Sequence, residues 1–79
     1  MDDWATLASP SARDWAGRAR YAAAMSLYQR GEIPAEVLEV YRICSRLDGE
    51  DALTLLALRG IGAEVIARIR RIRTEGGVL

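Results

Sequence analysis

The sequence contains no histidine and no lysine, and it has a single cysteine. Without histidine, the chain lacks the usual base of Ser-His and Cys-His catalytic pairs and the usual nitrogen ligand of zinc sites. It also has no P-loop that could cradle a phosphate. We therefore predict that the protein is not an enzyme, and we expect no metal, no cofactor and no small-molecule substrate.

The lone cysteine, Cys44, has no partner for an internal disulfide, and its position on an apolar helix face indicates a small core residue. No apolar run approaches the ~20 residues that a membrane-spanning helix needs. The acidic start at Asp2 and Asp3 is unlike a signal peptide. We expect a soluble cytoplasmic protein with no membrane partner.

Hydrophobic residues make up 51% of the chain, which is too many for a disordered protein. The length of 79 residues fits one domain, so we predict a single small helical domain over residues 1–79. At this size one hydrophobic core is barely sufficient. Binding to a partner or to a second copy is a common remedy.

The formal charge is zero, but the charged residues are unevenly distributed. Residues 32–51 carry six acidic residues and two arginines, whereas residues 59–79 carry five arginines and two glutamates. All eleven basic residues are arginine, which forms fixed bidentate contacts with carboxylate or phosphate better than lysine does. The isoelectric point of about 6.2 argues against a dedicated DNA-binding protein.

Capping residues and apolar spacing predict an all-α protein, a compact bundle of four to five short helices. Asp2 or Asp3 suits the cap of the first helix, and Pro34 suits the first position of the third. The expected helices are a short one containing Trp4 and Leu7, followed by residues 12–30, 34–47, 52–58 and 63–75.

The segment Tyr21-Ala22-Ala23-Ala24-Met25 has too little side-chain bulk to build a thick core. A neighbouring helix should therefore approach it closely. Packing within the chain and a helix interface in a dimer both fit this pattern, and we favour packing within the chain.

The most specific feature is a glycine hairpin between the last two predicted helices. Its two glycines can adopt a positive φ, and the isoleucine between them is predicted to point into the core. Apolar pairs, each three residues apart, flank the hairpin on both sides. The stretch resembles the helix-hairpin-helix family in these residues: Leu55 and Leu58, Gly60-Ile61-Gly62, and Ile66 and Ile69.

In that family, N–H groups at the second glycine and at the start of the following helix hold a DNA backbone phosphate. The resemblance therefore implies sequence-independent binding through the backbone of Gly62, Ala63 and Glu64. The sequence departs from the family pattern where Glu64 replaces a frequent lysine and where Ile66 replaces a small residue. In the earlier hairpin-like stretch, Pro34 stands in place of the second glycine and lacks its N–H donor.

Helical spacing predicts that Glu64 pairs with Arg68 and that Arg71 pairs with Glu75. These pairs would leave two other arginines of the last helix free to form a small basic patch with Arg59. When these arginines are added to the hairpin residues that the resemblance implies, the candidate phosphate or DNA site comprises Arg59, Gly60, Gly62, Ala63, Arg70 and Arg73.

An internal similarity relates residues 33–38 to residues 61–66, and Arg30-Gly31 to Arg59-Gly60 if one residue is inserted. One interpretation is a degenerate second helix-hairpin-helix unit around Gly31 to Leu38, packed against the first. The other is coincidence, because Ala-Glu-Val is a generic helix opening.

Two functional hypotheses follow. The first is a small non-enzymatic helical interaction module, a homodimer or an accessory subunit of a larger assembly, that keeps the hairpin fold for packing. Its partner interface would use the apolar ends of the chain, Trp4, Leu7, Val78 and Leu79. The alternative is weak, sequence-independent DNA binding through the backbone amides of the Gly60-Ile61-Gly62 hairpin.

Overall fold

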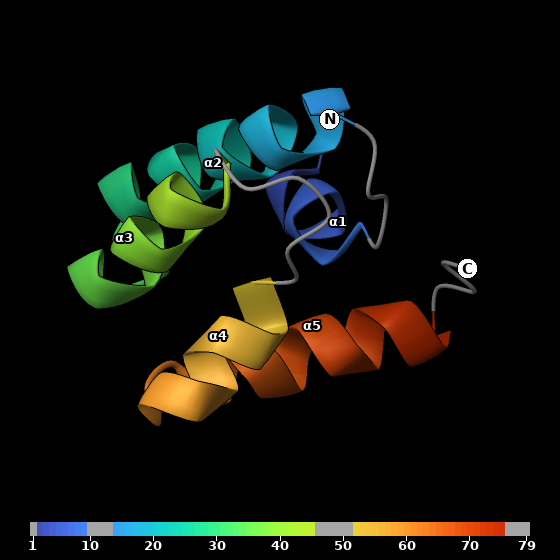
Figure 1. The fold of residues 1–79 in the computed structure, drawn as a ribbon. Helices are drawn as coiled ribbons and strands as arrows, with labels where there is room; N and C mark the ends of the chain where they lie inside the picture. Colours follow the sequence, from blue (N-terminus) through green and yellow to red (C-terminus); the bar gives the residue numbers. More distant parts are fainter. Residues whose placement is uncertain (1, 10–13, 46–51, 76–79) are drawn as a thin grey trace.

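The computed structural model describes residues 2–9, 14–45 and 52–75, with only the backbone described for residues 14–16. Across these residues the chain forms α-helices and no strands, so the all-α prediction is confirmed (Figure 1). The helices are α1 (Asp3–Ala8), α2 (Asp14–Gln29), α3 (Ala35–Cys44), α4 (Ala52–Arg59) and α5 (Ala63–Glu75).

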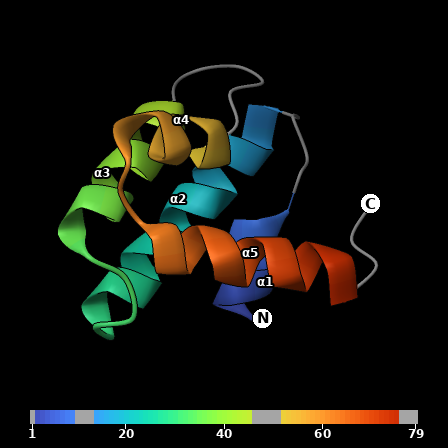
Figure 2. The same cartoon turned by 90° about the horizontal axis from the view of Figure 1, so that it is seen from below.

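Two groups of helices pack against each other. Helices α1, α2 and α3 lie together, and α4 and α5 form the layer that faces them (Figure 1). Helix α5 crosses α1, and α4 packs on α3 (Figure 2). None of the helices in the described part of the chain has the length and apolar character needed to cross a bilayer.

The helix boundaries follow the predicted ones closely. Helix α5 occupies the predicted range, and α4 continues one residue further than expected. Helix α3 begins after Pro34, whose ψ of 161° is extended, so this proline is the N-cap and not the first helical residue. The predicted helical positions 12, 13, 46 and 47 lie outside the described residues.

Helix α1 begins where a carboxylate can cap it. The Asp2 side chain accepts a hydrogen bond from the Trp4 backbone N–H at 3.0 Å, which satisfies one of the free amides of the first turn. One face of the helix is buried, with Trp4, Leu7 and Ala8 against the body of the protein. Burial of this face holds so short a helix in place, because an isolated helix of six residues would not be stable.

The alanine-rich part of α2 packs within the chain, as favoured from the sequence. Ala23 and Ala24 are buried, whereas Ala22 is exposed. A methyl group added to Gly17 would lie 3.3 Å from the Ser45 Cα, so the start of α2 approaches the end of α3 closely. Cys44, at that end of α3, is buried as predicted.

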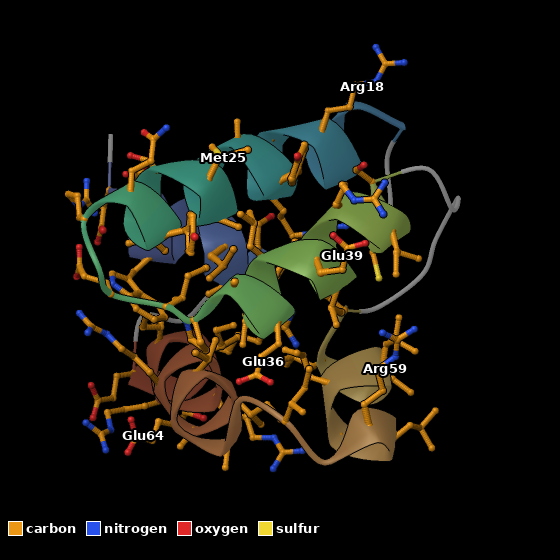
Figure 3. All side chains as sticks on the ribbon, turned by 90° about the vertical axis from the view of Figure 1, so that its left-hand side faces the viewer. Arg18, Met25, Glu36, Glu39, Arg59 and Glu64 are labelled. Carbon is orange, nitrogen blue, oxygen red and sulfur yellow. The ribbon has the colours of Figure 1, made fainter. Side chains whose placement is uncertain are left out.

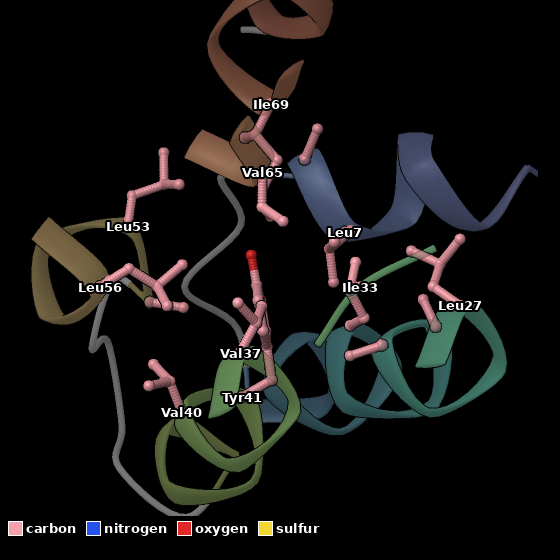
Figure 4. Packing of buried hydrophobic residues seen from close by; sticks show 14 of the residues in the cluster. Leu7, Leu27, Ile33, Val37, Val40, Tyr41, Leu53, Leu56, Val65 and Ile69 are labelled. Atoms are coloured by element: carbon pink, nitrogen blue, oxygen red, sulfur yellow. The ribbon is translucent and has the colours of Figure 1, made fainter. Parts of the chain in front are cut away.

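The core lies between the two groups of helices (Figure 4). Each helix contributes branched or aromatic side chains spaced by three or four residues, so that one stripe of each helix faces inward. The largest fully buried side chains are Leu7, Leu27, Val37, Val40, Tyr41, Leu56 and Ile69.

The chain makes the same turn at the ends of α2 and α4. Gly31 and Gly60 both have a positive φ, 76° and 66°, and each donates its N–H to the carbonyl three residues earlier. The next residue in each case, Glu32 or Ile61, donates to the carbonyl five residues earlier. These paired bonds define a Schellman motif, which needs glycine at its left-handed position.

Gly62 also has a positive φ, 68°, and close packing gives a second reason for a glycine at this position. A Cβ on this residue would lie 2.9 Å from Val37 Cγ2 and 3.5 Å from Leu56 Cδ2. Gly60, by contrast, has no neighbouring atom within 4 Å of the same position. The backbone at Gly62 therefore packs directly on α3, and only glycine allows this approach.

We expect Gly62→Ala to destabilise the protein more than Gly60→Ala. Both substitutions place a methyl group in the left-handed region, at a cost of about 1–2 kcal/mol. Gly62→Ala also forces the buried Val37 side chain to move, which adds about 1–3 kcal/mol for overpacking. Urea unfolding followed by circular dichroism measures both variants, and equal losses would show that the contact with Val37 is unimportant.

Candidate functional site

The resemblance noted in the sequence predicts a phosphate site at the start of α5. In the structure Ala63 and Glu64 are exposed, and Gly62, which precedes the helix, has no side chain to cap its first amides. Ile66 donates its N–H to the Gly62 carbonyl at 2.9 Å, which begins the helical hydrogen bonding. The N–H groups of this first turn therefore give the surface a partial positive charge.

An open pocket of about 330 Å³ lies beside this helix start. It is lined by residues 62–65 of the hairpin and α5, and by Trp4, Glu32, Pro34 and Arg68. Two carboxylates, those of Glu32 and Glu64, belong to the pocket wall together with a single arginine. The wall therefore carries more acidic than basic groups, which opposes the binding of a phosphate.

A chain of polar contacts runs along the pocket from α1 to the turn after α2. Trp4 donates its Nε1–H to Glu32 Oε1 at 3.1 Å. Arg30 bridges two carboxylates, donating from Nε to Glu32 at 2.7 Å and from Nη1 to Asp3 at 3.0 Å. These contacts join α1 to the turn between α2 and α3.

The Glu32 carboxylate is stabilised in its charged form. The hydrogen bond from Arg30 lowers the pKa of Glu32 most, the bond from Trp4 adds to it, and the charges of Arg30 and Arg68 lower it further. The hydrogen bond with Glu32 raises the pKa of Arg30 most, and the contact with Asp3 raises it further. The network is therefore formed fully at neutral pH.

Arg68 takes a different partner from the one predicted. Its guanidinium stacks over the Trp4 ring, 4.1 Å from the ring centroid, in a cation–π contact. Among the described residues, Glu64 forms no ion pair with Arg68, and Arg71 forms none with Glu75. The two predicted pairs are therefore wrong. Arg68 is drawn away from Glu64 because the Trp4 ring of α1 lies beside α5.

The structure does not gather the predicted arginines around the helix start. Arg70 is exposed, and it lies seven residues beyond Ala63, or about 10 Å along the helix axis. Arg73 is not free as expected, because its Nε–H donates to the Ala8 carbonyl at 2.8 Å. Arg59 is exposed at the end of α4, on the other side of the view in Figure 3 from Glu64. No basic patch forms from these three side chains.

Two of the four residues predicted to contact a partner are buried in the structure. Trp4 and Leu7 are only 6% and 1% exposed, so both belong to the core and are not available for a partner in this fold. The other two predicted contact residues, Val78 and Leu79, lie outside the described residues. Leu58 was assigned to the hairpin pattern, yet it is 78% exposed.

Leu58 is therefore the functional candidate that the sequence did not indicate. Leu55, one turn earlier, and Ile61, in the turn that follows, are each partly buried against the core. Leu53 and Leu56 supply the buried face of α4 instead. The spacing of three residues is the same for both leucine pairs, so periodicity could not have distinguished them.

Comparison of the chain with protein-family models, with curated proteins and with solved structures returns no match. The function is therefore inferred from the geometry of the surface and of the pocket.

We expect Glu32→Gln to make the protein less sensitive to acid. A lowered pKa in the folded state means that Glu32 stabilises the fold above its ordinary pKa of 4.5, and that this stability is lost as pH falls through the lowered value. The variant should therefore be less stable at pH 7 and should lose less stability between pH 7 and about pH 3.

Glu36→Gln is the matched control for this experiment, because Glu36 is exposed and forms no ion pair among the described residues. Thermal unfolding across this pH range measures all three proteins. If Glu32→Gln and the wild type lose stability in parallel, the contacts of Glu32 with Arg30 and Trp4 do not stabilise the fold.

Proposed function

We propose that the protein is a small non-enzymatic interaction module that binds another polypeptide through the surface around Leu58. The observation that carries this proposal is the exposure of Leu58, 78%, on a helix whose other leucines are buried or partly buried. The core is closed without this side chain, since Leu53 and Leu56 fill the inward face of α4. Packing of the core therefore does not require a leucine at this position.

The surroundings of Leu58 are suited to docking. Leu55 and Ile61, three residues before and after Leu58, are partly exposed, and Ala57 is exposed. The surface therefore has apolar area near the protruding Leu58 side chain. Arg59 follows directly and forms no ion pair among the described residues. Burying Leu58 in a complex would contribute about 1.5–3 kcal/mol, and a neighbouring arginine is a frequent interface residue.

DNA binding is the second candidate, and one observation favours it. The hairpin brings two positive-φ glycines and the uncapped amides of Ala63 and Glu64 to the surface, as a phosphate clamp requires. Against it stand the carboxylates of Glu32 and Glu64 in the adjacent pocket and the engagement of Arg73 with α1. With so few free cations near the helix start, binding would be weak and sensitive to salt.

Site-specific photocrosslinking in the native cells tests the interaction surface. With a photoreactive residue at position 58, we expect a discrete crosslinked protein, and we expect Leu55→Glu in the same chain to weaken it several-fold. The same label at the exposed Arg18 of α2 is the control and should give no adduct. Equal labelling from positions 58 and 18, or none from 58, would contradict the proposal.

A fluorescence-anisotropy titration of a short labelled duplex, at about 50 and about 200 mM salt, tests the second candidate. We expect the wild type to show no binding, and Glu64→Lys to gain weak binding because the substitution removes a repulsive carboxylate beside the amides. Salt-sensitive binding by the wild type that is weakened by Arg70→Ala would establish the hairpin as a phosphate clamp and reject our choice.

A further inference from the structure

The outward face of α5 carries charges that the fold leaves without partners. Glu64, Arg70 and Arg71 are all exposed, and none of them forms an ion pair with another described residue. Ala67, also exposed, lies almost directly opposite the buried pair Val65 and Ile69 on the helix. A small residue therefore marks the middle of this face, with an acid before it and arginines after it.

The spacing of these residues is self-complementary. Glu64 and Arg71 are seven residues apart, so they lie on the same flank of the helix, two turns from each other. When two copies of such a helix pack antiparallel, equal flanks meet with their directions reversed. Glu64 of each copy then faces Arg71 of the other, and the two Ala67 side chains meet at the centre.

We propose that α5 is the contact of a symmetric antiparallel homodimer, centred on Ala67 and fixed by two equivalent Glu64–Arg71 ion pairs between the copies. Ala67 allows the two helix backbones to approach closely, because it adds almost no bulk at the crossing point. A two-fold axis through the contact is the commonest symmetry of soluble oligomers.

The shape of the surface agrees with this contact. A shallow hollow of about 600 Å³ follows the Glu64 and Arg71 flank of α5. Its other lining residues are Asp2, Trp4, Ala67, Arg68 and Ile72, and the two charges among them, Asp2 and Arg68, are of opposite sign. The hollow provides room for the side chains of a second helix next to the charged pair. The partly buried Ile72 contributes apolar area that a second copy would cover.

A parallel helix pair and a nucleic acid both fit the charges of Glu64, Arg70 and Arg71 less well than the antiparallel dimer does. A parallel pairing centred on Ala67 would bring opposite flanks of the two α5 helices together, so that Arg71 of each copy would lie near Arg70 of the other, which is repulsive, and Glu64 would face no arginine. A nucleic acid would be attracted by Arg70 and Arg71 but repelled by Glu64 on the same face. A second copy in antiparallel orientation satisfies both signs of charge at once.

The α5 contact is separate from the docking surface around Leu58 on α4, so the dimer extends the proposed function without depending on it. A two-fold dimer formed in this way would present two Leu58 surfaces to a larger assembly. Such duplication raises the apparent affinity for a partner that has two binding sites.

Charge exchange tests the dimer directly. Sedimentation of the full chain, from about 1 μM to about 1 mM at about 50 mM salt, should show a monomer–dimer equilibrium that weakens at high salt. Glu64→Arg and Arg71→Glu should each weaken the dimer roughly tenfold or more, because each loses two ion pairs and creates two repulsions. The double variant, Glu64→Arg with Arg71→Glu, should restore the wild-type affinity.

Glu36→Arg is the matched control, because Glu36 occupies the same second position of α3 that Glu64 occupies in α5 (Figure 3). The Glu36→Arg substitution also places a cation near the positive end of a helix, so it has the same electrostatic cost for the fold, but it should leave the dimer affinity unchanged. Circular dichroism confirms that each variant is folded before its mass is measured.

A wild type that stays monomeric up to about 1 mM overturns the inference. So does a dimer that both single variants leave intact, or that the double variant fails to restore. If Leu58→Glu abolishes the dimer while the charge variants do not, the copies associate through α4, which rejects the α5 contact and leaves the proposed function in place.

Discussion

The backbone of Gly62 lies directly against the side chains of Val37 in α3 and Leu56 in α4. A side chain at this point would overlap Val37, and the positive φ of the residue would strain it as well. Gly62 directly precedes α5, so this contact fixes where that helix starts. Val65 and Ile69 lie three and seven residues after Gly62 and are buried in the core.

The arginines of α5 are divided between the inside and the outside of the molecule. Arg68 stacks on the Trp4 ring and Arg73 binds the Ala8 carbonyl, so two of them hold α1 against α5. Together with the bridge from Arg30 to Asp3, they attach α1, a helix of six residues, to two separate parts of the chain. A basic helix that would suggest nucleic-acid binding from sequence thus uses part of its charge for stability.

Two surface features, one on α4 and one on α5, take no part in the packing of the core. Helix α4 presents Leu58, an apolar side chain that the core does not require. Helix α5 presents Glu64 and Arg71 on one flank, with charges of opposite sign separated by Ala67. Apolar burial drives association, whereas charge spacing selects orientation. These two features are the basis for an interaction module that also pairs with its own copy.

The sequence by itself determined the helices and the glycine turns that follow α2 and α4. Caps such as Asp2 and the glycines at positions 60 and 62 act within a few residues, so local rules are sufficient to predict them. The similarity of Gly31 to Gly60 was also visible, and the two glycines lie in turns that have the same pair of hydrogen bonds. The membership of the chain in the helix-hairpin-helix family stays a prediction.

Only the tertiary structure decided which side chains the core would use and which it would leave outside. Leu55 with Leu58 and Leu53 with Leu56 have the same spacing, and the choice between them depends on the angle at which α4 packs on α3. Arg68 and Arg73 found their partners in α1, more than 60 residues away, where helical spacing gives no information. Trp4 and Leu7 looked like a free apolar end for the same reason, since the surface that covers them comes from distant parts of the chain.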